Sequence, residues 1–61
     1  MKIYNREKDG RTYTYKDNDL VSYPTNSDNT CSFSESEMVY VSEYDEPLAL
    51  DEIKEIETKL K

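Results

Sequence analysis

The stretch MKIYNREKDGRTYTY, residues 1–15, decides the predicted fold of this chain. Met1–Asn5 alternates polar and apolar residues, as a half-buried strand does. Lys8–Arg11 contains Asp-Gly, a strong hairpin signal because both residues tolerate a positive φ. Thr12–Tyr15 alternates aromatic and β-branched residues, which favours a return strand. The segment therefore predicts a β-hairpin.

Strand-like runs continue beyond this hairpin. Asp17–Asp19 predicts a second turn, and Leu20–Tyr23 predicts a short third strand, which the following proline ends. Glu37–Val41 is the most apolar run, and it predicts a strand buried on both faces and central in the sheet. Cys31–Phe33 is either a brief strand or part of a loop. The polar, turn-rich segment Thr25–Thr30 predicts an exposed, mobile loop.

Near the C-terminus, after a connection at Tyr44–Pro47, the hydrophobic period changes from two to 3.6. The apolar residues that share one helical stripe are Leu50, Ile53, Ile56 and Leu60. Acidic residues lead this segment and lysines end it, an order that suits the helix dipole. We expect a helix from about Ala49 to Leu60.

Together these elements predict an α+β fold in one small domain spanning residues 1–61. Its sheet is an antiparallel β-meander of three to five strands with an N-terminal hairpin, and one C-terminal amphipathic helix covers one face. A single helix leaves the other sheet face uncovered, with tyrosines and threonines on it. We expect a partner to bind there.

Size and composition limit the chemistry of the chain. A domain of 61 residues buries only about 60% of the surface that its unfolded chain exposes, so its core is marginal. Cys31 is the only cysteine and there is no histidine, so neither an internal disulfide nor a zinc site is expected. Gly10 is the only glycine, which excludes a glycine-rich phosphate loop. We therefore predict no enzyme, no metal and no cofactor, and dimerisation is one way to support the core.

The net charge of −6 is distributed unevenly. Residues 1–30 have five positive and five negative side chains, whereas residues 31–61 have three positive and nine negative ones. An acidic surface attracts basic proteins and repels nucleic acids and membrane phosphates, so direct binding to either is not predicted. The N-terminus lacks the apolar core of a signal peptide, and a lone cysteine suits a reducing compartment, so we expect a cytoplasmic protein.

The acidic second half leads to the functional hypothesis. On a strand, Glu35 and Glu37 would lie on one face about 6.6 Å apart, and on a helix Asp51 and Glu55 would have Cβ atoms about 5–6 Å apart. These spacings are of the order of phosphate spacing, which suggests DNA mimicry. We predict an inhibitor or modulator, of the kind that phages and mobile elements encode, that docks on a basic or nucleic-acid-binding surface of a host protein. The predicted contact residues are five carboxylates and two anchoring tyrosines: Glu35, Glu37, Tyr40, Glu43, Tyr44, Asp45 and Glu46.

Residues 36–46, SEMVYVSEYDE, resemble a strand-and-turn stretch of the uracil-DNA glycosylase inhibitor family, mainly at Tyr44-Asp45-Glu46. Members of that family are acidic phage proteins that mimic DNA. The family's glutamate-serine-isoleucine contact segment is not reproduced, because Glu35-Ser36 is followed by Glu37. The resemblance favours the inhibitor class and transfers no site residue.

A second hypothesis assigns the chain to a structural or assembly role. The marginal core and the tyrosine-rich sheet face would then be completed by a second copy of the chain. A monomer at high micromolar concentration would exclude this role.

Overall fold

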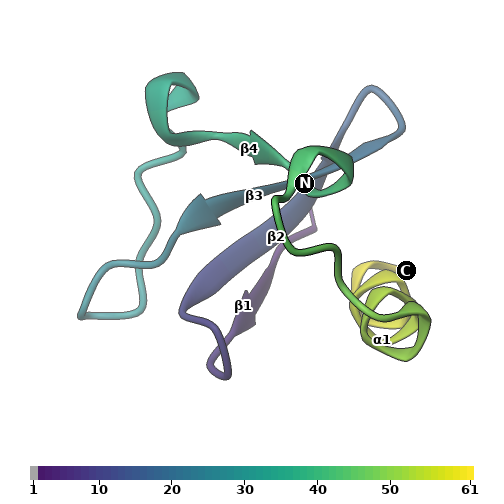
Figure 1. Ribbon diagram of the computed structural model, residues 1–61. Helices are drawn as coiled ribbons and strands as arrows, with labels where there is room; N and C mark the ends of the chain where they lie inside the picture. Colours follow the sequence, from purple (N-terminus) through teal and green to yellow (C-terminus); the bar gives the residue numbers. More distant parts are fainter. Residues whose placement is uncertain (1) are drawn as a thin grey trace.

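The computed structural model describes residues 2–61 as a four-stranded antiparallel sheet with one C-terminal helix (Figure 1). In chain order the elements are β1 (Tyr4–Arg6), β2 (Arg11–Lys16), β3 (Asp19–Pro24), the 3-10 helix η1 (Glu35–Glu37), β4 (Val39–Tyr40), the 3-10 helix η2 (Val41–Glu43) and α1 (Leu50–Leu60). The strands pair in the order β1-β2-β3-β4. The predicted α+β meander with an N-terminal hairpin is confirmed. Met1, where the first predicted strand began, lies outside the described residues.

The two tight connections in the sheet use left-handed backbone at different residues. Residues 7–10 connect β1 to β2, and Gly10 has a φ of 65°. Only Asp17 and Asn18 separate β2 from β3, and their φ values are 54° and 83°. Two central residues with positive φ match the twist of a hairpin, and aspartate and asparagine tolerate this conformation. The second turn predicted at Asp17–Asp19 is therefore confirmed, with Asp17-Asn18 as its two central residues, whereas the first turn, which contains Asp-Gly, is four residues long.

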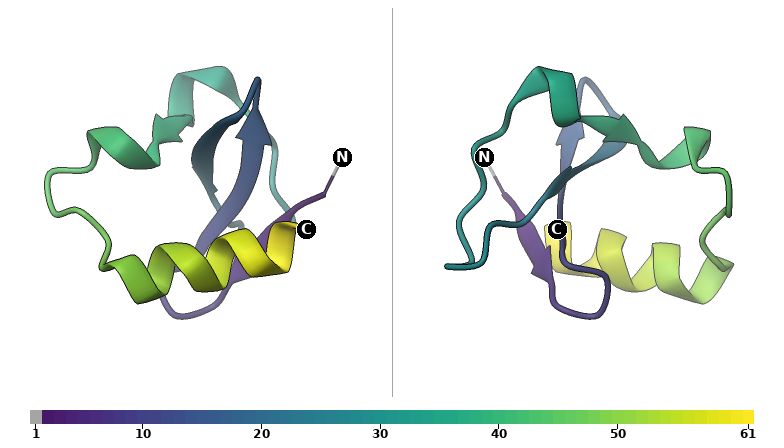
Figure 2. Two further views of the ribbon diagram at one scale, coloured as in Figure 1. Left: turned by 90° about the vertical axis from the view of Figure 1, so that its right-hand side faces the viewer. Right: turned by 60° about the vertical axis from the view of Figure 1, so that its left-hand side comes forward.

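The main core lies between the sheet and α1, which runs along one sheet face (Figure 2). Tyr13 from β2 and Ile56 from α1 have no exposed surface, and Val41 and Leu60 complete the buried cluster. Burial of a large apolar side chain contributes about 1.5–3 kcal/mol. This cluster fixes the helix against the first hairpin.

The opposite sheet face is also covered, so the prediction of an open second face is wrong. Thr12 and Val21 are fully buried there, and Tyr23 is nearly so. The long segment between β3 and η1 folds back over them: the Phe33 ring packs edge-on against Tyr23 with ring centroids 5.2 Å apart. At the start of this segment, Thr25 shares a 2.8 Å hydrogen bond with Thr12. Pro24 and the polar residues after it turn the chain back across the sheet. An irregular segment therefore covers this face, and no second helix is needed there.

The prediction of a central, doubly buried strand at Glu37–Val41 is also wrong. β4 contains only Val39–Tyr40 and forms an edge of the sheet, and the Val39 side chain is 37% exposed. The 3-10 helices η1 and η2 flank it directly. The apolar run lies between serines and glutamates that favour solvent, so it is too short to be covered on both sides. Only its last residue, Val41, reaches the core.

The helix has the predicted position, but not all of its apolar stripe is buried. Ile56 and Leu60 are buried and Ile53 is half-buried, whereas Leu50 is 74% exposed. The reason is that the first turn of α1 extends beyond the strands (Figure 2). No helix within residues 2–61 combines the length and the apolar surface that crossing a membrane requires.

The polar loop at Thr25–Thr30 is exposed from residue 26 onward, as predicted. Its backbone closes on itself, because the Asn26 N–H donates to the carbonyl oxygen of Thr30 over 2.7 Å. The Asp28 carboxylate accepts from the Thr30 backbone N–H over 3.1 Å, and its contacts with Thr30 lower the Asp28 pKa. The mobility of this loop stays a prediction. Cys31–Phe33 is loop rather than strand.

Candidate functional site

The structure divides the predicted contact carboxylates into two groups at opposite ends of β4 (Figure 1). Glu35 and Glu37 lie on η1, before the strand. Glu43 ends η2, after the strand, and Asp45 and Glu46 follow it. The prediction that Glu35 and Glu37 lie on a strand is wrong, because both belong to a 3-10 helix. The strand spacing that was compared with phosphate spacing is therefore not present at these two residues.

Of the first group, Glu35 has a cationic partner within the chain. Its carboxylate lies 3.5 Å from the Lys16 ammonium, on the last residue of β2. The Glu35 side chain is 83% exposed, so water screens this pair and its contribution to stability is small. The Glu35 charge nevertheless raises the Lys16 pKa.

The two predicted tyrosine anchors are parts of the fold rather than exposed side chains. The Tyr44 hydroxyl forms a short hydrogen bond with Ser22 Oγ on β3, and Ser22 Oγ also accepts from Arg11 Nε over 2.9 Å. The Tyr44 ring packs against the main core. Tyr40 is half-buried and pairs in register with Val21, on the sheet face away from α1. Tyr44 thus packs its ring against the core while its hydroxyl reaches a polar partner.

The second group forms an acidic turn, by which we mean Glu43, Asp45 and Glu46. All three side chains are exposed. Together with Val39 and Tyr44 they line a shallow surface hollow of about 510 Å³. Among the ion pairs of residues 2–61, none involves these three carboxylates. The acidic turn is therefore a compact negative surface beside Val39 and Tyr44.

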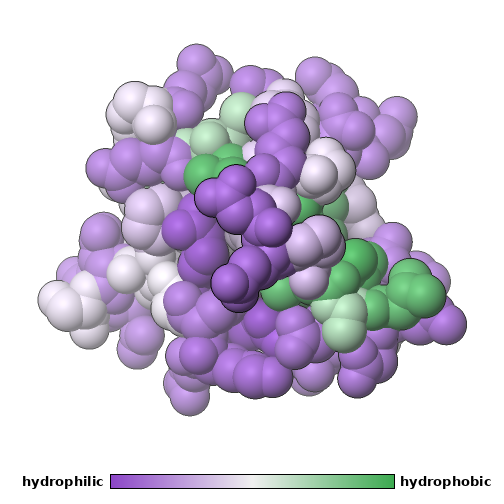
Figure 3. All heavy atoms as spheres, in the orientation of Figure 1, coloured by the Kyte–Doolittle hydropathy of each residue, from purple (hydrophilic) through white to green (hydrophobic). Residues whose placement is uncertain are grey.

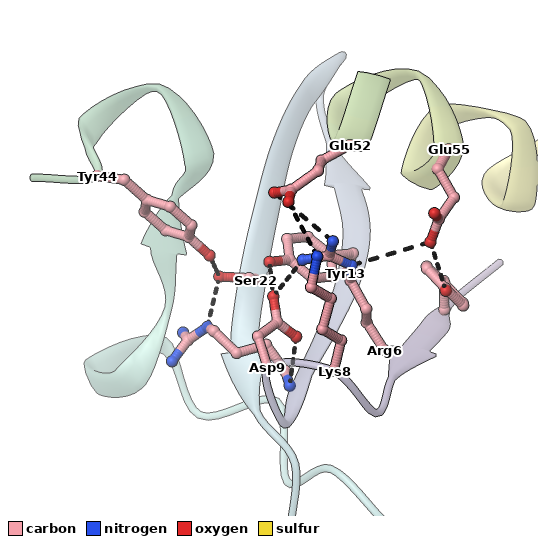
Figure 4. Close-up of polar contacts among 10 residues, drawn as sticks. Arg6, Lys8, Asp9, Tyr13, Ser22, Tyr44, Glu52 and Glu55 are labelled. Atoms are coloured by element: carbon pink, nitrogen blue, oxygen red, sulfur yellow. Dashed lines mark hydrogen bonds and ion pairs between the residues drawn. The ribbon is translucent and has the colours of Figure 1, made fainter. Parts of the chain in front are cut away.

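Other acids of the second half are occupied in an ion-pair network with the first hairpin, which we call the latch: Arg6, Lys8, Asp9, Glu52 and Glu55 (Figure 4). Arg6 is only 4% exposed and lies 2.9 Å from Asp9, 3.6 Å from Glu52 and 3.9 Å from Glu55. Lys8 lies 3.2 Å from Glu52. A buried guanidinium requires such partners, since an unpaired buried charge is costly. The latch joins β1 and its turn to the helix.

Tyrosine hydroxyls extend the latch on both sides. Tyr13 donates to Asp9 over 2.5 Å, and Tyr4 donates to Glu55 over 3.0 Å. Burial and the hydrogen bond to Asp9 raise the Tyr13 pKa well above its usual range. Burial opposes the charge of Arg6, but the bond to Asp9 and the nearby carboxylates leave its pKa raised. These tyrosines therefore remain neutral donors and Arg6 remains a cation at physiological pH.

Sequence reasoning did not find the latch, although one signal was present. Arg6 has the same strand parity as Tyr4, so it had to face the same side of the sheet as that aromatic ring. Its partners on the helix lie more than forty residues away, and no local spacing indicates them.

No group of three or more His, Cys, Asp or Glu within residues 2–61 is arranged to hold a metal ion. Cys31 is a free, half-buried thiol.

Comparison with known proteins gives no relative. No family model matches the sequence, and neither the curated proteins nor the solved structures give a significant match. The resemblance of residues 36–46 to the uracil-DNA glycosylase inhibitors therefore gains no support from these comparisons.

Proposed function

We propose that this chain is a small, non-enzymatic protein-binding module that docks on a basic surface of another protein through its acidic turn. An inhibitor or modulator of the kind that phages and mobile elements encode would work in this way, by covering a nucleic-acid-binding surface of a host protein in the cytoplasm. The chain would act through surface charge rather than through a reaction.

The observation that supports this proposal is the difference between two sets of carboxylates. Glu52 and Glu55 are held by cations of the chain itself, whereas Glu43, Asp45 and Glu46 have no ion pair among the described residues. Three like charges within four consecutive residues repel one another, which costs stability in the free protein. A cationic partner would relieve this repulsion, so the same charges favour binding.

Self-association through an open sheet face is not part of this proposal. Thr12, Thr14 and Val21 are buried on the face that was expected to be open.

The proposal is tested by capturing partners from a lysate of the source organism on the immobilised full chain, with mass spectrometry as the readout. The variant Glu43→Gln/Asp45→Asn/Glu46→Gln removes three charges from the acidic turn. A matched control, Glu7→Gln/Asp17→Asn/Asp51→Asn, removes three exposed charges elsewhere and reaches the same net charge. We expect a partner that the wild type and the control retain, that the acidic-turn variant loses, and that dissociates as salt rises. Equal retention by all three proteins, or binding unaffected by salt, would contradict the proposal.

A further inference from the structure

A second hollow lies on the far side of the segment that carries the acidic turn. It has a volume of about 320 Å³, and its apolar lining comes from Leu20 on β3, Val41 on η2, Leu48 in the connection and Ile53 on α1. We call it the groove. Leu20 and Leu48 also pack against the main core, so the floor of the groove is the outer surface of that core.

The groove continues into exposed apolar surface. Figure 3 shows hydrophobic side chains gathered over the start of α1 and the connection before it, with hydrophilic side chains around them. Leu50, in the first turn of α1, is 74% exposed, and Tyr15, which lines the groove, is 41% exposed. Leu50 belongs to the same helical stripe as Ile53. Contiguous exposed apolar surface with a polar rim is typical of a binding site.

Charge at the rim restricts what can occupy the groove. Asp19 and Glu57 are among its lining residues, and neither has an ion pair within residues 2–61. Tyr15 and Glu57 both line the groove, and burial and the Glu57 charge raise the Tyr15 pKa. Val41 and Ser42, which also line the groove, lead directly into Glu43 of the acidic turn. Two carboxylates without an ion pair among residues 2–61 therefore line the groove beside its apolar residues, and a third, Glu43, follows it in the chain.

We propose that the groove binds a short basic segment of the partner protein, with one or two aliphatic side chains on the apolar floor and flanking lysines or arginines facing Asp19, Glu57 and the acidic turn. This inference rests on the proposed function and names the chemistry of the partner. An anionic ligand would be repelled at the rim, and an uncharged one would leave the carboxylates without a counter-charge. A second copy of the chain brings a net charge of −6 to the same rim, which opposes its binding.

The first test is a titration of the isotope-labelled full chain, followed by amide NMR, with three synthetic peptides that have blocked ends. The first has two leucines between two Lys-Arg pairs, the second replaces the leucines by serines, and the third replaces the basic residues by glutamates. We expect the first peptide alone to shift the amides of Leu20, Val41, Ser42, Leu48 and Ile53, with the other two binding at least about tenfold more weakly. Equal shifts with the serine peptide, shifts spread over the surface, or shifts that depend on protein concentration alone would each overturn the proposal.

The second test fills the groove. Ser42 is exposed and lines it, so Ser42→Trp places a large ring over the floor, while Ser32→Trp adds the same ring at an exposed position outside the groove. We expect Ser42→Trp to weaken the leucine peptide and the lysate partner by about tenfold or more, and Ser32→Trp to leave both unchanged. If the partner is lost when the acidic turn is neutralised but is retained by Ser42→Trp, the proposed role of the groove is contradicted. The proposed function then remains intact. A partner retained by both variants would overturn the two together.

Discussion

The latch and the acidic turn contain the same kinds of side chain in opposite situations. In the latch, Glu52 and Glu55 approach a guanidinium that is 4% exposed, and their charges are compensated within the fold. In the acidic turn, Glu43 and Glu46 lie exposed beside Asp45 with no ion pair among residues 2–61. The difference shows that the excess negative charge of the second half is only partly a surface property. Part of it holds the helix on the hairpin, and three of the carboxylates without an ion pair among residues 2–61 lie together at one turn.

The largest expected effect comes from removing the central cation of the latch. Arg6→Ala leaves Asp9 without its cation and Glu52 with Lys8 alone, and breaking a buried ion pair costs about 3–5 kcal/mol. Because the carboxylates are partly exposed, we expect a loss of about 2–3 kcal/mol in the free energy of unfolding, measured by urea denaturation. A domain of this length has about 3–9 kcal/mol in total, so the variant is expected to be close to unfolding.

Arg6→Met is the matched control for this substitution. It keeps much of the apolar stem that packs under the helix, and so separates lost packing from lost charge. We expect Arg6→Met to be nearly as destabilising as Arg6→Ala. A methionine variant as stable as the wild type would show that the latch contributes packing rather than charge compensation.

The second prediction concerns alkaline pH. The folded-state pKa of Tyr13 is raised above that of an unfolded tyrosine, about 10, so above this pH the folded state binds more protons than the unfolded state. The contribution of Tyr13 is therefore complete below about pH 10, and it decreases by up to about 1.4 kcal/mol per pH unit above it. Urea denaturation of the wild type and of Tyr13→Phe at about pH 9 and about pH 11 measures the two slopes.

We expect Tyr13→Phe to be less stable than the wild type at neutral pH, because Asp9 loses a donor, and to have the shallower decline above pH 10. Tyr4 and Tyr15 also have raised pKa values, so some decline will persist in the variant. Parallel declines in the two proteins would contradict the role of Tyr13.

These contrasts also explain how far the sequence could be read in advance. The hairpin, the third strand and the helix follow from local patterns, because alternation and a 3.6 period act over a few residues. The covered second face does not, because it depends on where an irregular segment such as the one around Phe33 returns. The predicted site included the three carboxylates of the acidic turn, which are neighbours in the sequence and line one hollow in the structure, and their role in binding stays a prediction. Its tyrosines were assigned to the surface because sequence does not show that the Tyr44 hydroxyl has a partner on Ser22.

The third prediction compares one glutamate from each region. Glu52→Gln weakens two contacts of the latch, to Arg6 and Lys8, and we expect a loss of about 1 kcal/mol in the free energy of unfolding. Glu46→Gln removes a charge that lies among like charges, so we expect an unchanged or slightly higher urea midpoint. The substitution is chemically the same, so a loss of equal size in both variants would remove the distinction between the two regions.

The smallest effect on stability is expected for the exposed pair of Lys16 and Glu35. This pair tests whether an exposed, paired carboxylate behaves like those of the latch or like those of the acidic turn. Both side chains are well solvated, so pairing here competes with water and with side-chain entropy. We expect Lys16→Gln and Glu35→Gln each to leave the urea midpoint unchanged. If the acidic turn is the docking surface, Glu35→Gln will also retain the captured partner. Loss of the partner from Glu35→Gln alone would show that the contact surface is at η1, at the other end of β4. The ion pair between Glu35 and Lys16 would then compete with binding of the partner.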